Sequence, residues 1–212
     1  MLTGFTAALL LITLCELGDK SFFVALVLAT RHSRAWVFGG TLAALALMTL
    51  LSVALGQMLT ILPERLVQGL GTVLLLGFGL RLVIQAWHTC PEARCGGEHE
   101  AQSALTQAPA GRFSLLQTWG QRCPQVLVGG QAFLLAFLSE WGDRTQISTI
   151  TLGATYSPGA VTLGAIAGHA VSTGLAVLGG RLLAGRLRER TLLGLGGGLF
   201  LLFGGLTLVA PS

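Results

Sequence analysis

Six apolar stretches, each about 20 residues or longer, make up most of this chain and limit what it can fold into. They cover approximately residues 4–30, 35–62, 66–87, 127–154, 158–184 and 191–209. With 52% hydrophobic residues, 10% charged residues and a mean hydropathy of +0.74, the composition excludes a soluble globular domain. Because an apolar helix of this length crosses the hydrocarbon layer of a bilayer, the sequence predicts an all-α membrane protein with six transmembrane helices.

The first residues, MLTGFTAALLLITLCELGDK, are interpreted as a transmembrane helix rather than a signal peptide. No basic residue precedes the apolar run, and Glu16 and Asp19 stand where a cleavage region would be small and neutral. Of the four cysteines, Cys15 falls in this helix and the others fall in the central loop. Since that loop is expected to be cytoplasmic, structural disulfides are not expected.

The basic residues between the expected spans lie mostly on one side of the membrane. The opposite side has only Arg65, whereas this side collects Arg31, Arg34, Arg94, Arg112, Arg122, Arg181, Arg186, Arg188 and Arg190. Because Lys and Arg are retained on the cytoplasmic side, the bias predicts a cytoplasmic central loop and non-cytoplasmic N and C termini. The net charge of +4 follows from this anchoring and does not indicate nucleic-acid binding.

The two ends of the chain carry related sequences. A shift of 124 positions aligns the motif ELGDKS (Glu16 to Ser21) with EWGDRT (Glu140 to Thr145). The same shift aligns Gly40 with Gly164 and Gly56 with Gly180, and after one inserted residue Gly69, Gly71 and Gly79 align with Gly194, Gly196 and Gly204. Since three helices are an odd number, the copies would cross the membrane in opposite directions. The pattern predicts an inverted repeat of two three-helix units whose motifs face each other near mid-membrane.

We therefore divide the chain into a first repeat (1–88), a cytoplasmic linker (89–126) and a second repeat (127–212). The linker segment HTCPEARCGGEHE brings together residue types that bind soft metals, namely His88, Cys90, Cys95, Glu98 and His99. The spacing of its cysteines fits no common zinc motif. A plain polar loop is the favoured interpretation, with regulatory metal binding as the alternative.

Four acidic residues fall inside the expected spans: Glu16, Asp19, Glu140 and Asp143. An ionised carboxylate at mid-membrane costs about 2.5–3.5 kcal/mol, so these side chains are expected to point into the bundle. The three-residue spacing within each motif puts both acids on one face of a continuous helix. A purely structural alternative is that each glutamate pairs with the basic residue four positions later, Lys20 or Arg144. That alternative leaves both aspartates unexplained.

The charges and ligand types of the motifs indicate a hard divalent cation. Four carboxylates against two basic groups leave a formal charge of minus two, which one divalent cation neutralises. With the hydroxyls of Ser21 and Thr145, they form an all-oxygen set suited to Mn²⁺ or Ca²⁺ rather than Zn²⁺ or Cu⁺. Gly18 and Gly142 would expose a backbone carbonyl or allow a helix to break or cross closely.

A carboxylate binds either a metal ion or a proton, so the two compete for one site. We therefore expect antiport of one divalent cation against about two protons, with the two halves rocking around the site.

The two motifs match the pattern Glu-x-Gly-Asp-Lys/Arg-Ser/Thr, and with them the chain resembles the Gdt-type cation/proton antiporter family of Golgi, chloroplast and cyanobacterial manganese and calcium transporters. Its short length and its first residues look most like the cyanobacterial manganese exporters. The resemblance implies a six-helix protein of a thylakoid or plasma membrane that exports Mn²⁺, or also Ca²⁺, from the cytoplasm in exchange for protons. It implies cation binding by Glu16, Asp19, Glu140 and Asp143, with Gly18, Lys20, Ser21, Gly142, Arg144 and Thr145 supporting the cation and proton path. The cation is substrate, and no cofactor is implied.

Two further residues stand out in the spans. His169 would relay protons or be hydrogen-bonded to its neighbours, and Arg81 is expected to extend to the membrane interface. The sequence determines neither the choice of Mn²⁺ over Ca²⁺ nor the oligomeric state.

The competing functions are an exporter of small organic molecules such as amino acids and a membrane assembly factor that transports nothing. The first would not need four clustered acids, and the second would tolerate their neutral replacement. An enzyme is not expected, because neither motif supplies a nucleophile with its base or a histidine metal site.

Overall fold

The structure, a computed structural model, describes residues 2–17, 19–61, 63–88, 124–183 and 189–209. Within these ranges the regular elements are helices: α1 (Leu2–Glu16), α2 (Lys20–Arg31), α3 (Arg34–Leu59), α4 (Glu64–His88), α7 (Pro124–Ser139), α8 (Arg144–Thr155), α9 (Pro158–Leu183) and α10 (Glu189–Val209). The expected linker falls outside the described residues up to position 123, and so do Cys90, Cys95, Glu98 and His99 of its cysteine and histidine segment.

The first and fourth expected spans are each broken into two helices. The prediction of continuous helices over 4–30 and 127–154 is wrong, because both stretches are interrupted at the acidic motif. Helices α1 and α2 contain 15 and 12 residues. Their lengths of about 22 and 18 Å are each too short to cross a hydrocarbon layer of about 30 Å. Each pair of short helices therefore stands where the sequence predicted one continuous span.

The other expected spans agree with α3, α4, α9 and α10 to within a few residues. By length and composition, three stretches among the described residues could cross a membrane, namely Arg34–Leu59, Gly69–His88 and Pro158–Gly179. Large apolar side chains are exposed on several of the helices, for example Leu50, Leu74, Leu163 and Leu178. Helices satisfy their own backbone hydrogen bonds and such side chains are compatible with lipid, so the chain is a helical membrane protein.

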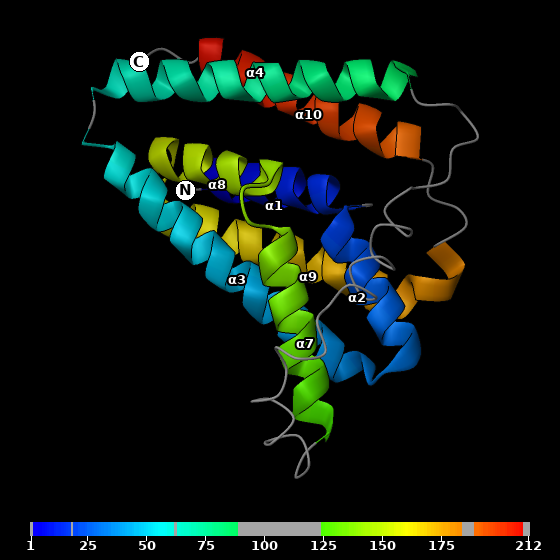
Figure 1. The fold of residues 1–212 in the computed structure, drawn as a ribbon. Helices are drawn as coiled ribbons and strands as arrows, with labels where there is room; N and C mark the ends of the chain where they lie inside the picture. The colour runs from blue at the N-terminus through cyan, green and yellow to red at the C-terminus, as the bar shows by residue number, and fades with distance from the viewer. Residues whose placement is uncertain (1, 18, 62, 89–123, 184–188, 210–212) are drawn as a thin grey trace.

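The helices pack mainly across the boundary between the two parts of the chain. Helices α4 and α10 lie side by side in a layer of their own, above the remaining helices in Figure 1. Helix α1 packs on α9, and α7 packs on α3 in the corresponding way. Helix α2 likewise contacts α9, and α8 contacts α3. The contacts made by the first part of the chain thus recur in the second.

Two glycines at aligned positions allow close helix crossings. A Cβ atom on Gly40 of α3 would overlap the backbone carbonyl of Gly129 in α7, and one on Gly164 of α9 would overlap that of Phe5 in α1. The offset of 124 that aligns Gly40 with Gly164 also aligns Phe5 with Gly129. The same backbone contact is therefore made twice, at aligned positions.

We expect Gly40→Ala to lower the free energy of unfolding by about 1–3 kcal/mol, because the added methyl group overlaps a carbonyl that cannot rotate away. Thermal unfolding of the purified protein in detergent measures the effect. Gly39→Ala is the matched control, since a Cβ atom at Gly39 meets nothing within 4 Å. Equal melting temperatures for the two variants would contradict the close crossing of α3 and α7.

Candidate functional site

Both acidic motifs adopt the same backbone conformation at a helix break. Asp19 and Asp143 stand directly before α2 and α8, with φ and ψ of −81° and 173° in the first motif and −79° and 171° in the second. The backbone N–H of each aspartate donates to the carbonyl of the glutamate three residues earlier, at 3.2 Å in both motifs. The prediction that glutamate and aspartate share one face of a continuous helix is therefore wrong. The glutamate lies at the end of one segment, and the aspartate begins the next.

Gly142 permits the break before α8. Its φ of +81° lies in the left-handed region, which side chains with a Cβ atom rarely adopt. Its N–H donates to Oε1 of Gln146 at 2.7 Å, and a Cβ atom there would meet nothing within 4 Å. Glycine is required here by the backbone angle and not by lack of space. Gly18 lies outside the described residues.

The two glutamates are buried, and each accepts a hydrogen bond from a hydroxyl group. Glu16 is 1% exposed and Glu140 is 3% exposed. The Ser21 hydroxyl donates to Glu16 Oε2 at 2.9 Å, and the Thr145 hydroxyl donates to Glu140 Oε2 at 3.1 Å. The Ser21 hydroxyl also interacts with Glu140. Ser21 therefore lies between the two glutamates, which are far apart in the sequence.

The four motif acids lie within electrostatic range of one another, but the two glutamates are buried more deeply than the two aspartates. Glu16 interacts with Glu140 and with both aspartates, and Glu140 also interacts with both aspartates. Among the described residues, no three His, Cys, Asp or Glu side chains form a group that could hold a metal ion. The glutamates are buried, whereas Asp19 and Asp143 line a cavity. The side chain of Arg144 is not among those described.

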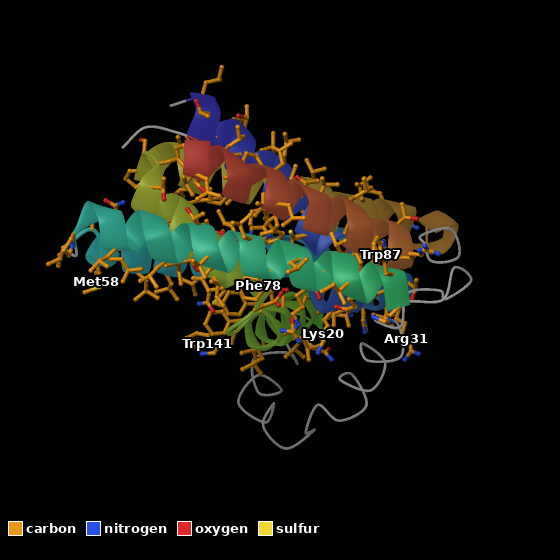
Figure 2. All side chains as sticks on the ribbon, turned by 90° about the horizontal axis from the view of Figure 1, so that it is seen from above. Lys20, Arg31, Met58, Phe78, Trp87 and Trp141 are labelled. Atoms are coloured by element: carbon orange, nitrogen blue, oxygen red, sulfur yellow. The ribbon has the colours of Figure 1, made fainter. Side chains whose placement is uncertain are left out.

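The cavity beside the aspartates has a volume of 460 Å³ and mixes polar and apolar groups. It is large enough to hold many water molecules. Its lining comprises Asp19, Lys20, Phe78, Arg81, Leu82, Gln85, Ser139, Trp141, Gly142, Asp143 and Ile147. Figure 2 shows Lys20, Phe78 and Trp141 close together along α4. Sequence reasoning did not place Arg81 and Gln85 at the site, although two polar residues four apart in an apolar helix were the available signal.

A second, much smaller cavity lies beside Glu140. Its 10 Å³ leave room for about one water molecule. Hydroxyl groups of Thr49 and Ser52 from α3 and of Thr149 from α8 line it. Each hydroxyl donates its proton to the carbonyl four residues earlier in its own helix, at 2.9, 2.7 and 2.7 Å. Only oxygen lone pairs remain available to a ligand. Sequence reasoning missed these residues, which are recognisable as hydroxyls at helical spacing in apolar spans.

His169 on α9 lies next to both glutamates. It is 4% exposed, and its Nδ1 atom lies 3.4 Å from Glu16 Oε1. It also lines the small cavity together with Glu140. The geometry at 3.4 Å does not make a hydrogen bond, and neither Nδ1 nor Oε1 has a hydrogen-bond partner among the described residues. The Ser172 hydroxyl bonds to the backbone carbonyl of His169 and not to its ring.

Residues 4–89 and 128–212 match the family described as "Divalent cation/proton antiporter GDT1". GDT1-like protein sll0615 of Synechocystis sp. is 43% identical over 203 residues, which cover 96% of this chain and 95% of that protein. GDT1-like protein 3 of Oryza sativa subsp. indica is 39% identical over 93% of this chain and 70% of its own length. The chloroplastic PAM71-homolog of Arabidopsis thaliana is 37% identical over 97% of this chain and 59% of its own length. No solved structure matches. These matches confirm the resemblance drawn from the two motifs.

We expect Gly142→Ala to destabilise the protein by about 1–2 kcal/mol, because a Cβ atom is strained in the left-handed conformation. Gly142→Asn should be milder, since asparagine adopts this conformation more readily than alanine. Thermal unfolding in detergent ranks the two variants. Alanine melting at or above asparagine would show that Gly142 does not hold a positive φ.

Proposed function

Because the chain belongs to the GDT1 family of divalent cation/proton antiporters, we propose that it exports Mn²⁺, and also Ca²⁺, from the cytoplasm in exchange for protons. The observation that carries the proposal is the meeting of Glu16 and Glu140 at two helix breaks in an apolar bundle. Carboxylates in such a place are costly unless a cation or a proton compensates them. The glutamates would hold the transported ion, and Asp19 and Asp143 would receive it from the larger cavity.

The ligand chemistry supports a divalent cation that prefers oxygen. The carboxylates are accompanied by hydroxyls whose protons are already donated, either to a glutamate (Ser21, Thr145) or to a backbone carbonyl (Thr49, Ser52). These oxygens can therefore accept but not donate. Carboxylates and such oxygens are the ligands that Mn²⁺ and Ca²⁺ prefer.

The helix breaks add favourable electrostatics. Helices α1 and α7 end at or next to a glutamate, so the partial negative charge of their last carbonyl groups lies beside the site and favours a cation. Helices α2 and α8 begin at the motifs, where the carboxylates of Asp19 and Asp143 match the partial positive charge of the helix start. Broken helices around a midplane ion site are the usual arrangement in secondary transporters.

The two cavities suggest how the ion reaches the site. In the orientation predicted from the basic residues, Arg81 and Gln85 lie in the cytoplasmic half of α4, so the 460 Å³ cavity would open to the cytoplasm. The 10 Å³ cavity would then be the closed exit path. We propose that the repeats 1–88 and 127–212 form an inverted pair that rocks around the glutamates. The paired contacts of Gly40 and Gly164 support this symmetry.

Neutral replacement of the motif acids should reduce transport. In proteoliposomes, we expect Asp19→Asn, Asp143→Asn, Glu16→Gln and Glu140→Gln each to lower Mn²⁺ and Ca²⁺ uptake at least about tenfold, because each loses a charged ligand. Glu64→Gln, an acid at the start of α4 outside the motifs, is the control and should keep wild-type flux. Wild-type rates in all four motif variants would rule out the site.

Proton coupling is tested by imposing a pH gradient on the same vesicles. Mn²⁺ flux should increase when the gradient drives protons in the opposite direction, and internal pH should change with metal movement. Mn²⁺ flux that neither responds to the gradient nor moves protons would contradict the exchange.

A further inference from the structure

The two halves of the site are not chemically equivalent. The offset of 124 that aligns Glu16 with Glu140 also aligns Leu45 with His169. In the structure, Glu16 faces His169 from α9, and Glu140 lines the small cavity with Leu45 from α3. Position 169 therefore places an imidazole 3.4 Å from Glu16, whereas the aligned position 45 carries an alkyl side chain. The duplicated motifs by themselves predict no such difference.

The imidazole nitrogen is free to bind a ligand. Glu16 Oε2 is held by the Ser21 hydroxyl, which leaves Oε1 facing His169 Nδ1. Both of these atoms are buried and lack a hydrogen-bond partner among the described residues. Buried polar atoms nearly always make a hydrogen bond, so two such atoms that face each other at 3.4 Å without one point to a third group that joins them.

The spacing of these atoms fits a metal ion. Neighbouring ligands at about 2.1–2.6 Å from an octahedral ion lie roughly 3.0–3.7 Å from each other. The 3.4 Å between Nδ1 and Oε1 falls within that range. Nδ1 and Oε1 would thus supply two ligands, and His169 also lines the small cavity with Glu140. Since no three acidic or histidine side chains among the described residues are yet grouped to hold an ion, Glu140 would have to approach the pair when the ion binds.

We propose that His169 is a nitrogen ligand of the transported cation and makes the carrier prefer a first-row transition dication such as Mn²⁺ over Ca²⁺ and Mg²⁺. Ca²⁺ and Mg²⁺ take oxygen ligands, whereas transition ions also accept an imidazole nitrogen. Mn²⁺ stands at the weak end of the affinity series, so one nitrogen provides a moderate preference. The inference rests on the proposed function, since it requires that Glu16 and Glu140 hold the ion.

A spectroscopic experiment tests the bond itself. Mn²⁺ alone is added to the purified protein in detergent, and ¹⁴N couplings to the bound ion are recorded by electron spin echo envelope modulation. Wild type and Ser172→Ala, a control on the same helix turn that keeps the imidazole, should show the ¹⁴N signal. His169→Gln should bind Mn²⁺ without it, because the glutamine amide binds through oxygen. An unchanged ¹⁴N signal in His169→Gln would overturn the proposal.

Transport measurements test whether His169 makes the carrier prefer Mn²⁺ over Ca²⁺. His169→Leu gives position 169 the same residue that stands at the aligned position 45. In proteoliposomes, it and His169→Gln should lower the ratio of Mn²⁺ to Ca²⁺ uptake about tenfold or more while Ca²⁺ uptake persists. Ser172→Ala should keep the wild-type ratio. An equal loss for both ions in both His169 variants would overturn the proposal and indicate a proton relay or a structural role.

Failure of the proposed function and failure of the histidine's role would give different results. A wild-type protein that moves neither ion, or Glu140→Gln with unchanged flux, contradicts the proposed function. A wild-type protein that moves both ions, with an unchanged ratio in the His169 variants, contradicts only the role of the histidine.

Discussion

The constraint on which the rest of this structure depends is the placement of two carboxyl groups, Glu16 and Glu140, inside an apolar bundle. A charge in this position needs compensation, and several features of the fold supply it or make room for it. Hydroxyls donate to one oxygen of each glutamate, and the carbonyl groups at the ends of α1 and α7 add partial negative charge that favours a cation beside the carboxylates. Close crossings at Gly40 and Gly164 pack α3 on α7 and α9 on α1, the helices that lead to the two glutamates. The helix breaks and the polar lining can thus be understood as consequences of one electrostatic requirement.

The contacts between helices recur in the two parts of the chain, but the cavities beside the motif acids differ in size. Corresponding helices make corresponding contacts, yet the cavity lined by Asp19 and Asp143 has a volume of 460 Å³ and the one lined by Glu140 and His169 has a volume of 10 Å³. In the alternating-access mechanism proposed above, exchanging the conformations of the two halves would move the opening of the larger cavity to the other side of the membrane. The chemical difference between Leu45 and His169 is of another kind, since it persists in either conformation. The difference in cavity size concerns how an ion reaches the site, and the difference between Leu45 and His169 concerns which ion the site prefers.

How well the sequence predicted the fold depended on the element. The spans corresponding to α3, α4, α9 and α10 were found to within a few residues, because the length of an apolar run largely defines a membrane helix. The stretches 4–30 and 127–154 looked equally continuous, yet both are broken at the motif. The break depends on backbone angles such as the positive φ of Gly142, which hydropathy does not report. The glycine in the motif was compatible with a helix break, but the break itself is seen only in the backbone conformation of the structure.

The sequence by itself determined that this is a helical membrane protein, that it carries two copies of an acidic motif, and which family it belongs to. These properties are readable because each is a local pattern of apolar length, charge or spacing. Only the tertiary structure decided which groups meet: Ser21 between the glutamates, Arg81 at the larger cavity, and His169 opposite Glu16. Such contacts join residues from helices far apart in the chain, and they follow from how α1 packs on α9 and from where α4 leaves space. No periodicity within a single helix encodes that packing.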